Sequence, residues 1–167
     1  MLAHYWNTFA ELIAVPFQQI SLIWGIVPLY FALLLNEITS TQANFRTALQ
    51  TGFSFVWAAV QWLFPYFKAH PHHAPEIELN SMLPVNLFVT FLVLGLGCLA
   101  LYSGLRRKYP KYCNFLGYTR FSNYFMITIF PIQMHFLQWS WDRLAVIVIF
   151  ALPVWLLLHF GLMPLRK

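Results

Sequence analysis

The sequence predicts an all-α protein, a polytopic transmembrane bundle of about five helices preceded by an amphipathic helix at the membrane surface. Of its 167 residues, 60% are hydrophobic and only 9% are charged, whereas about a quarter of the residues of a soluble domain are charged. The chain also divides into apolar runs of roughly the 20 residues that a membrane helix needs. We therefore expect residues 1–167 to form a single integral membrane domain.

The first expected element is an interfacial amphipathic helix over residues 1–16. Apolar side chains such as Trp6 and Phe9 recur at helical spacing, and polar residues such as Glu11 occupy the other side. The open alternative is that this segment begins a longer, tilted first span. No basic segment followed by an apolar core opens the chain, so we expect no cleavable signal peptide.

Five apolar runs follow, each bounded by polar or proline-containing segments. The expected spans are residues 20–37, 45–67, 84–105, 121–141 and 144–163. Three of them carry a proline near the middle, namely Pro28, Pro131 and Pro153. Membrane helices accommodate such prolines when neighbouring groups satisfy the carbonyls that the prolines leave free.

The connection Leu105–Arg120 predicts the orientation of the bundle. It contains half of the ten Lys and Arg residues: Arg106, Arg107, Lys108, Lys111 and Arg120. Basic connections stay on the cytoplasmic side of a membrane. This places eight of the ten basic residues inside, with the N-terminus outside and the C-terminus cytoplasmic. We expect a multi-pass protein of a prokaryotic plasma membrane or an equivalent organelle membrane.

The same basic residues predict partners. Because they flank apolar spans, orientation and anionic lipid headgroups explain the net charge of +5, and we expect no nucleic-acid partner. The residues expected to contact lipid or a protein partner are Arg106, Arg107, Lys108 and Lys111. Cys98 lies in an expected span and Cys113 in the basic connection, so a disulfide is not expected.

Polar residues inside the expected spans follow helical spacing. The stripe in residues 45–67 contains Thr47, Gln50, Ser54, Trp57 and Gln61. The stripe in residues 121–141 and the next position contains Tyr124, Thr128, Pro131, His135, Gln138 and Asp142. A face of small or hydrogen-bonding residues in 84–105 contains Asn86, Thr90, Gly97, Ala100 and Gly104.

Two interpretations of these stripes stay open. The first is hydrogen bonding between helices, with the small face letting a neighbouring backbone approach closely. The second is a polar conduit in which His135, near mid-depth, relays protons. Glu37, Arg46 and Arg120 are expected at the inner end of the bundle, either as an anchoring ion pair or as a gate.

A histidine-rich connection follows the second span. It contains His70, His72, His73, Glu76 and Glu78. Imidazole and carboxylate groups suit Zn²⁺ or Cu²⁺. However, Pro71 and Pro75 prevent a regular helix from presenting these ligands on one face, so adventitious metal binding or docking to a partner is the alternative.

The sequence favours a non-catalytic function. It lacks the usual hydrolase, zinc-protease, haem-attachment and phosphate-binding motifs, so we expect no enzyme activity. Its 32 aromatic residues, 7 Trp, 8 Tyr and 17 Phe, exceed what interfacial belts need. We expect a subunit or scaffold that binds lipid and associates with other membrane subunits or with itself. The alternative is a small oligomeric channel or proton-coupled transporter.

Overall fold

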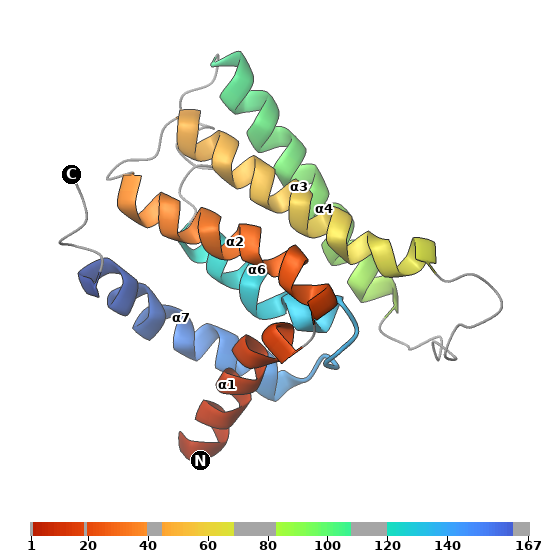
Figure 1. Ribbon diagram of the computed structural model, residues 1–167, viewed down its shortest axis with the longest axis vertical. Coiled ribbons are helices and arrows are strands. Elements are labelled where there is room, and N and C mark those ends of the chain that lie inside the picture. The colour runs from red at the N-terminus through yellow and green to blue at the C-terminus, as the bar shows by residue number, and fades with distance from the viewer. Residues whose placement is uncertain (1, 19, 40–44, 69–82, 108–119, 162–167) are drawn as a thin grey trace.

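The computed structural model describes residues 2–18, 20–39, 45–68, 83–107 and 120–161, and all its elements are helices (Figure 1). They are α1 (Leu2–Gln18), α2 (Ile20–Thr39), α3 (Phe45–Lys68), α4 (Leu83–Arg106), α6 (Arg120–Gln133) and α7 (Trp141–Gly161). The prediction of an all-α fold is confirmed for the described part of the chain.

Two described helices, α4 and α7, are long and apolar enough to cross a membrane. A third crossing is added only if α1 and α2, which are bent sharply against each other, are counted as one span. The five-span arrangement therefore stays a prediction. Helix α6 has 14 residues, or about 21 Å of rise, against a hydrocarbon core of about 30 Å.

Helices α3 and α4 form an antiparallel pair with close backbone contact (Figure 1). A Cβ atom on Gly97 would lie 2.9 Å from Phe55 Cβ and 3.0 Å from the Val56 backbone nitrogen. A Cβ atom on Gly52 would lie 2.9 Å from the Gly97 carbonyl oxygen. Glycine lets membrane helices approach this closely. The predicted small face is confirmed: Asn86, Thr90, Gly97, Ala100 and Gly104 are all buried.

Helix α6 is the most enclosed of the described helices. From Asn123 to Gln133 every residue except Phe125 is buried. It packs against α1, α2, α3 and α7. The Phe130 ring lies so close to Gly25 of α2 that a Cβ atom added there would touch it. A helix that is covered on all sides meets protein instead of lipid, so its length does not have to match the bilayer.

Helix α1 packs across the beginning of α7. The rings of Phe9 and Phe150 stack with their centroids 4.4 Å apart. An Arg143 guanidinium nitrogen lies 3.5 Å from Glu11 Oε2. Helix α1 continues to Gln18, two residues beyond the expected end at Pro16. Its place at a membrane surface stays a prediction.

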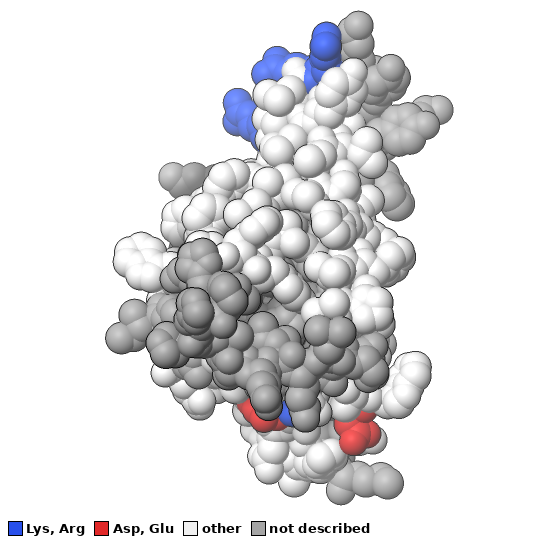
Figure 2. Space-filling model, turned by 90° about the vertical axis from the view of Figure 1, so that its right-hand side faces the viewer, with Lys and Arg blue, Asp and Glu red and all other residues white. Residues whose placement is uncertain are grey.

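The described charges separate along the long axis of the molecule. Figure 2 shows basic side chains at one end and acidic side chains near the other. Arg106, the last residue of α4, and Arg107 after it lie level with Arg46 in the first turn of α3, because a Cβ atom on Gly104 would lie 3.1 Å from the Phe45 carbonyl oxygen. Towards the other end, Glu11 and Asp142 lie beside Arg143 and His4.

The glycine contacts give a first prediction. Gly97→Ala should lower the free energy of unfolding by about 1–3 kcal/mol, because the added methyl group meets the α3 backbone. Gly95→Ala is the matched control two residues away, where a Cβ atom has no neighbour within 4 Å. Thermal unfolding of both variants in the same detergent measures the difference. Equal melting temperatures would contradict the close contact.

Candidate functional site

Four side chains join the end of α3, the beginning of α4 and the connection 134–140 between α6 and α7. We call Tyr66, Asn86, His135 and Trp139 the connection cluster. His135 Nε2 lies 2.8 Å from the Tyr66 hydroxyl oxygen, and His135 Nδ1 lies 3.4 Å from Asn86 Nδ2. The Trp139 indole N–H donates to Asn86 Oδ1. These bonds tie together segments up to 69 residues apart in the sequence.

The donors and acceptors of the connection cluster determine its hydrogen-bond directions. An indole nitrogen can only donate, so Asn86 presents its oxygen to Trp139 and its amide nitrogen to His135. His135 Nδ1 must then accept, which leaves the proton on Nε2 to donate to the Tyr66 oxygen. The cluster thus requires a neutral imidazole in one tautomer. Desolvation also lowers the pKa of His135, which lies outside the helices, below its usual value.

His135 also terminates α6. Its φ angle is 61°, in the left-handed region. The Phe136 N–H donates to the Pro131 carbonyl at 3.0 Å, and the His135 N–H donates to the Ile132 carbonyl at 3.0 Å. This is a Schellman cap, in which glycine usually occupies the position that His135 takes here. The left-handed conformation costs a non-glycine residue about 1–2 kcal/mol, and the hydrogen bonds of the imidazole offset this cost.

The expected helix over 121–141 is therefore shorter than the sequence suggested. The polar spacing from Tyr124 to Asp142 continues through the cap, and no glycine marks the helix end. The signal that could have found the break is Ser140, whose hydroxyl oxygen accepts from the Arg143 backbone N–H at 3.2 Å. Serine at this position is a helix N-cap, and α7 begins at the next residue, Trp141.

Four Ser and Thr hydroxyl groups on α3, α4 and α6, three of them from the predicted stripes and the small face, donate within their own helices. Each donates to the carbonyl four residues earlier: Thr51 to Thr47, Ser54 to Gln50, Thr90 to Asn86 and Thr128 to Tyr124, at 2.7–3.0 Å. Such bonds satisfy the hydroxyl without joining helices. Bonds between helices come from two stripe residues, since Trp57 Nε1 donates to the Gly25 carbonyl at 3.0 Å and Tyr124 to the Ile147 carbonyl at 2.8 Å. The Thr90 hydroxyl also donates to Gln133 Oε1 of α6 at 3.4 Å.

The predicted polar residues separate into different places. Thr128 and Ser54 are buried, and Gln61 faces α2 near Gly25. The Gln138 carbonyl accepts from Arg143 at 2.6 Å. Asp142 lies 4.0 Å from His4. Of the two predicted stripes, His135 alone belongs to the connection cluster, so the stripe through 121–141 is not continuous.

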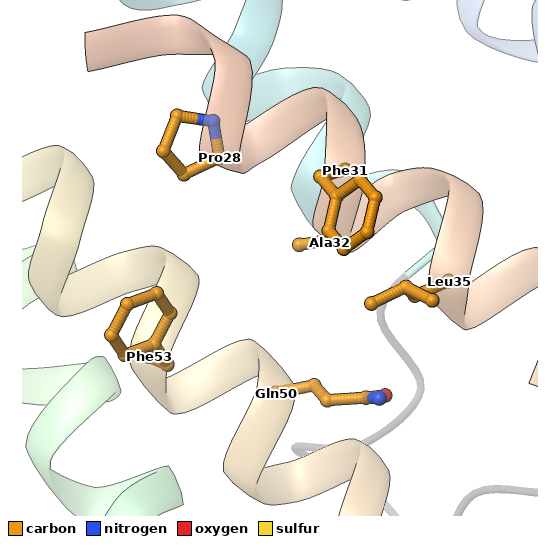
Figure 3. A pocket seen from close by; sticks show the side chains of 6 residues that line it. All are labelled: Pro28, Phe31, Ala32, Leu35, Gln50 and Phe53. Atoms are coloured by element: carbon orange, nitrogen blue, oxygen red, sulfur yellow. The ribbon is translucent and has the colours of Figure 1, made fainter. Parts of the chain in front are cut away.

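A groove between α2 and α3 contains Gln50 (Figure 3). Its volume is about 180 Å³. It is lined by Pro28, Phe31, Ala32, Leu35, Gln50 and Phe53. The Gln50 side chain is the one polar member of this lining, and its Oε1 is buried without a hydrogen-bond donor in the described structure. The groove is smaller than the pockets of about 300–1,000 Å³ that hold drug-sized ligands.

Several predicted site residues lie outside the described residues or side chains. These are the side chains of Glu37 and Arg120, and residues Lys108, Lys111, His70, His72, His73, Glu76 and Glu78. Their expected ion pairs and metal site stay predictions. Within the described ranges, no group of three or more His, Cys, Asp or Glu side chains comes together. Arg106 lies over the Tyr102 ring, 5.6 Å from its centroid.

Comparisons with known proteins give no relative: no family model, curated protein or solved structure matches this chain.

Two substitutions of His135 test the cap. Both remove the imidazole, but His135→Gly relieves the left-handed strain and His135→Ala keeps it. The glycine variant should be more stable than the alanine variant by about 1 kcal/mol, measured by thermal unfolding in detergent. A residue inside a continuous helix would give the opposite order, because alanine is the better helix former. A more stable alanine variant would contradict the cap.

Proposed function

We propose that the protein is a non-catalytic integral membrane subunit or scaffold, which packs against other membrane subunits or a second copy of itself. The observation that carries this proposal is the uncovered surface of α7. Only 17% of its apolar stretch is buried within the chain. Leu157 is 71% exposed and Val148 is 65% exposed. A helix this apolar needs lipid or a protein partner around most of its circumference.

The kind of residue exposed supports a protein partner in addition to lipid. Large rings are exposed along α2, α3 and α4, among them Trp24, Phe31, Phe67 and Phe88. Aromatic side chains contribute large contact areas at protein interfaces. By contrast, the hydroxyl groups of Ser54, Thr90 and Thr128 donate to carbonyls of their own helices. The chain thus offers large apolar rings on its outer surface.

The charge separation supports the proposed orientation. Arg46, Arg106 and Arg107 lie at one end of the α3–α4 pair. With this end in the cytoplasm, the arginines follow the positive-inside rule and meet anionic lipid headgroups, together with the connection after α4. The connection cluster then lies towards the outer side, and the protein crosses the membrane several times with its N-terminus outside and its C-terminus inside.

A proton-coupled channel or transporter is the second candidate, because His135 belongs to a connected chain of hydrogen bonds with Tyr66 and Asn86. A proton pathway needs polar groups that continue across the bilayer. The stripe that would supply them ends where α6 ends at Gln133, and its hydroxyl group at Thr128 is already bonded within α6. The subunit is therefore the better-supported proposal.

A photo-crosslinking amino acid at Leu157 tests the subunit proposal in native membranes. Because this side chain points away from the rest of the chain, it should yield a discrete adduct larger than the protein by the mass of a partner or of a second copy. Val146, which is buried in α7, is the matched control and should yield only intramolecular products.

Gentle detergent extraction then checks stoichiometry. The subunit proposal predicts recovery with a partner, or with a second copy, at a fixed ratio. A monodisperse monomer whose Leu157, Phe88 and Phe31 positions all crosslink only to lipid would contradict it.

A further inference from the structure

The connection cluster has a property beyond its place in a membrane subunit. It favours the neutral state of His135, because Trp139 holds the Asn86 amide with its nitrogen, a donor, directed at His135 Nδ1. We propose that it is a pH-sensitive latch: protonation of His135 breaks the bond to Asn86 and releases the connection 134–140, with the beginning of α7, from α4. This inference concerns the isolated chain and does not depend on the partner proposed above.

The first step is the orientation of the Asn86 amide. Trp139 donates its indole N–H to Asn86 Oδ1, and an indole cannot accept a hydrogen bond. If the amide turned over, its NH₂ group would face the indole N–H and both donors would lack an acceptor. Trp139 thus keeps the Asn86 nitrogen directed at His135 Nδ1.

The second step is the conflict that protonation creates. An imidazolium ion carries a proton on both ring nitrogens. Its Nδ1–H would point at Asn86 Nδ2 across the 3.4 Å that separates these nitrogens. Two donors facing each other repel, and the amide cannot turn without losing Trp139. Protonation therefore costs one bond of the cluster, either His135 to Asn86 or Asn86 to Trp139.

The third step is that the described surroundings offer the imidazolium no carboxylate. From α3 it meets the Tyr66 phenol, from α4 the uncharged Asn86, and from its own connection the uncharged Trp139. The described carboxylates at this side of the molecule, Glu11 and Asp142, lie beside Arg143 and His4. Among the described residues, therefore, no carboxylate stabilises the charged state of His135, which leaves solvent as its stabilising surrounding because the residue is exposed.

The fourth step is the backbone. The 61° φ angle of His135 is an unfavourable conformation that the side-chain bonds help to hold. Loss of the Asn86 bond removes part of that support just before α7. Since Asp142 and Arg143 in the first turn of α7 contact α1, release of this turn also loosens α1. With the proposed orientation, the latch would respond to the pH outside the cytoplasm.

The sign of the pH dependence follows from the lowered pKa of His135. A folded-state pKa below the unfolded value near 6.5 means that the unfolded chain binds more protons. The latch therefore stabilises the fold fully above about pH 6.5 and loses this contribution as the pH falls through the folded-state pKa.

The test follows the Trp139 indole N–H of the full chain in lipid nanodiscs by ¹H–¹⁵N NMR. The Trp139→Phe variant assigns this signal among the seven tryptophans of the sequence. Between about pH 8 and about pH 5, the chemical shift of this signal should change with a single midpoint below about pH 6.5. Its protection from solvent exchange should fall about five- to tenfold, as for one lost hydrogen bond.

Three variants isolate His135. His135→Gly keeps the cap conformation without a titrating group, so the Trp139 signal should lose its pH response. His4→Gln, the matched control at an imidazole beside Asp142, should keep the response. Asn86→Asp places carboxylate oxygens, which accept hydrogen bonds, opposite both Trp139 and His135. The Trp139 indole N–H should then stay protected from exchange at about pH 5, and the pKa of His135 should rise above 6.5.

A Trp139 signal that does not respond to pH in the natural chain overturns the latch, and so does a response of equal size in His135→Gly. If Asn86→Asp fails to fold, the comparison of the natural chain with His135→Gly still gives the answer.

Discussion

The close contact between α3 and α4 is the constraint on which the rest of the structure depends. Gly52 and Gly97 bring the two backbones so near that a single methyl group at either position would meet main-chain atoms. Lipid gives helices no hydrophobic reason to associate, so packing at such short range supplies much of the attraction. A contact of this kind also sets the register of α3 against α4, because sliding one helix along the other would move the small residues out of the positions where the backbones touch.

Both ends of the molecule follow from this register. At one end, Arg46 lies level with the arginines that end α4. At the other end, Tyr66 near the end of α3 and Asn86 near the beginning of α4 lie close enough to bond the same imidazole. The basic end and the connection cluster thus lie at opposite ends of the α3–α4 pair. A small chain can therefore carry both an orientation signal and a polar contact site.

Helix α6 shows how the chain satisfies backbone groups inside an apolar surrounding. Unpaired carbonyls are costly where water is absent, and the helix ends early, at Gln133. In the cap at His135, two backbone N–H groups donate to carbonyl oxygens of the last turn of α6. The neighbouring helices cover the remaining surface of α6. By contrast, α4 and α7, the two described helices long and apolar enough to cross a membrane, keep most of their apolar surface uncovered.

Much of this arrangement could be predicted from composition and periodicity. The apolar runs indicated helices in the right places, and the spacing of Gly97, Ala100 and Gly104 indicated the face that packs. The end of α6 could not be predicted in this way, since the polar spacing continues and a histidine occupies the position where glycine is usual.

The chemistry of the site was harder to predict, because it depends on contacts that are distant in the sequence. Arg143 and Glu11 are 132 residues apart, and nothing in their local sequence indicates that they meet. Residues on one helical face also need not share a role. Ser54 and Thr128 donate to carbonyls of their own helices, whereas Trp57 and Tyr124, which belong to the same two stripes, donate to neighbouring helices.

The proposed orientation requires α4 to cross the membrane, with its arginine end in the cytoplasm and the connection cluster towards the outside. Single cysteines at Pro84 and at Leu105, near opposite ends of α4 and both exposed, test it in a chain that carries Cys98→Ser and Cys113→Ser. A membrane-impermeant thiol reagent added to intact cells should label the Pro84→Cys chain, and should label the Leu105→Cys chain only after permeabilisation. Labelling of both positions from the same side would contradict the account.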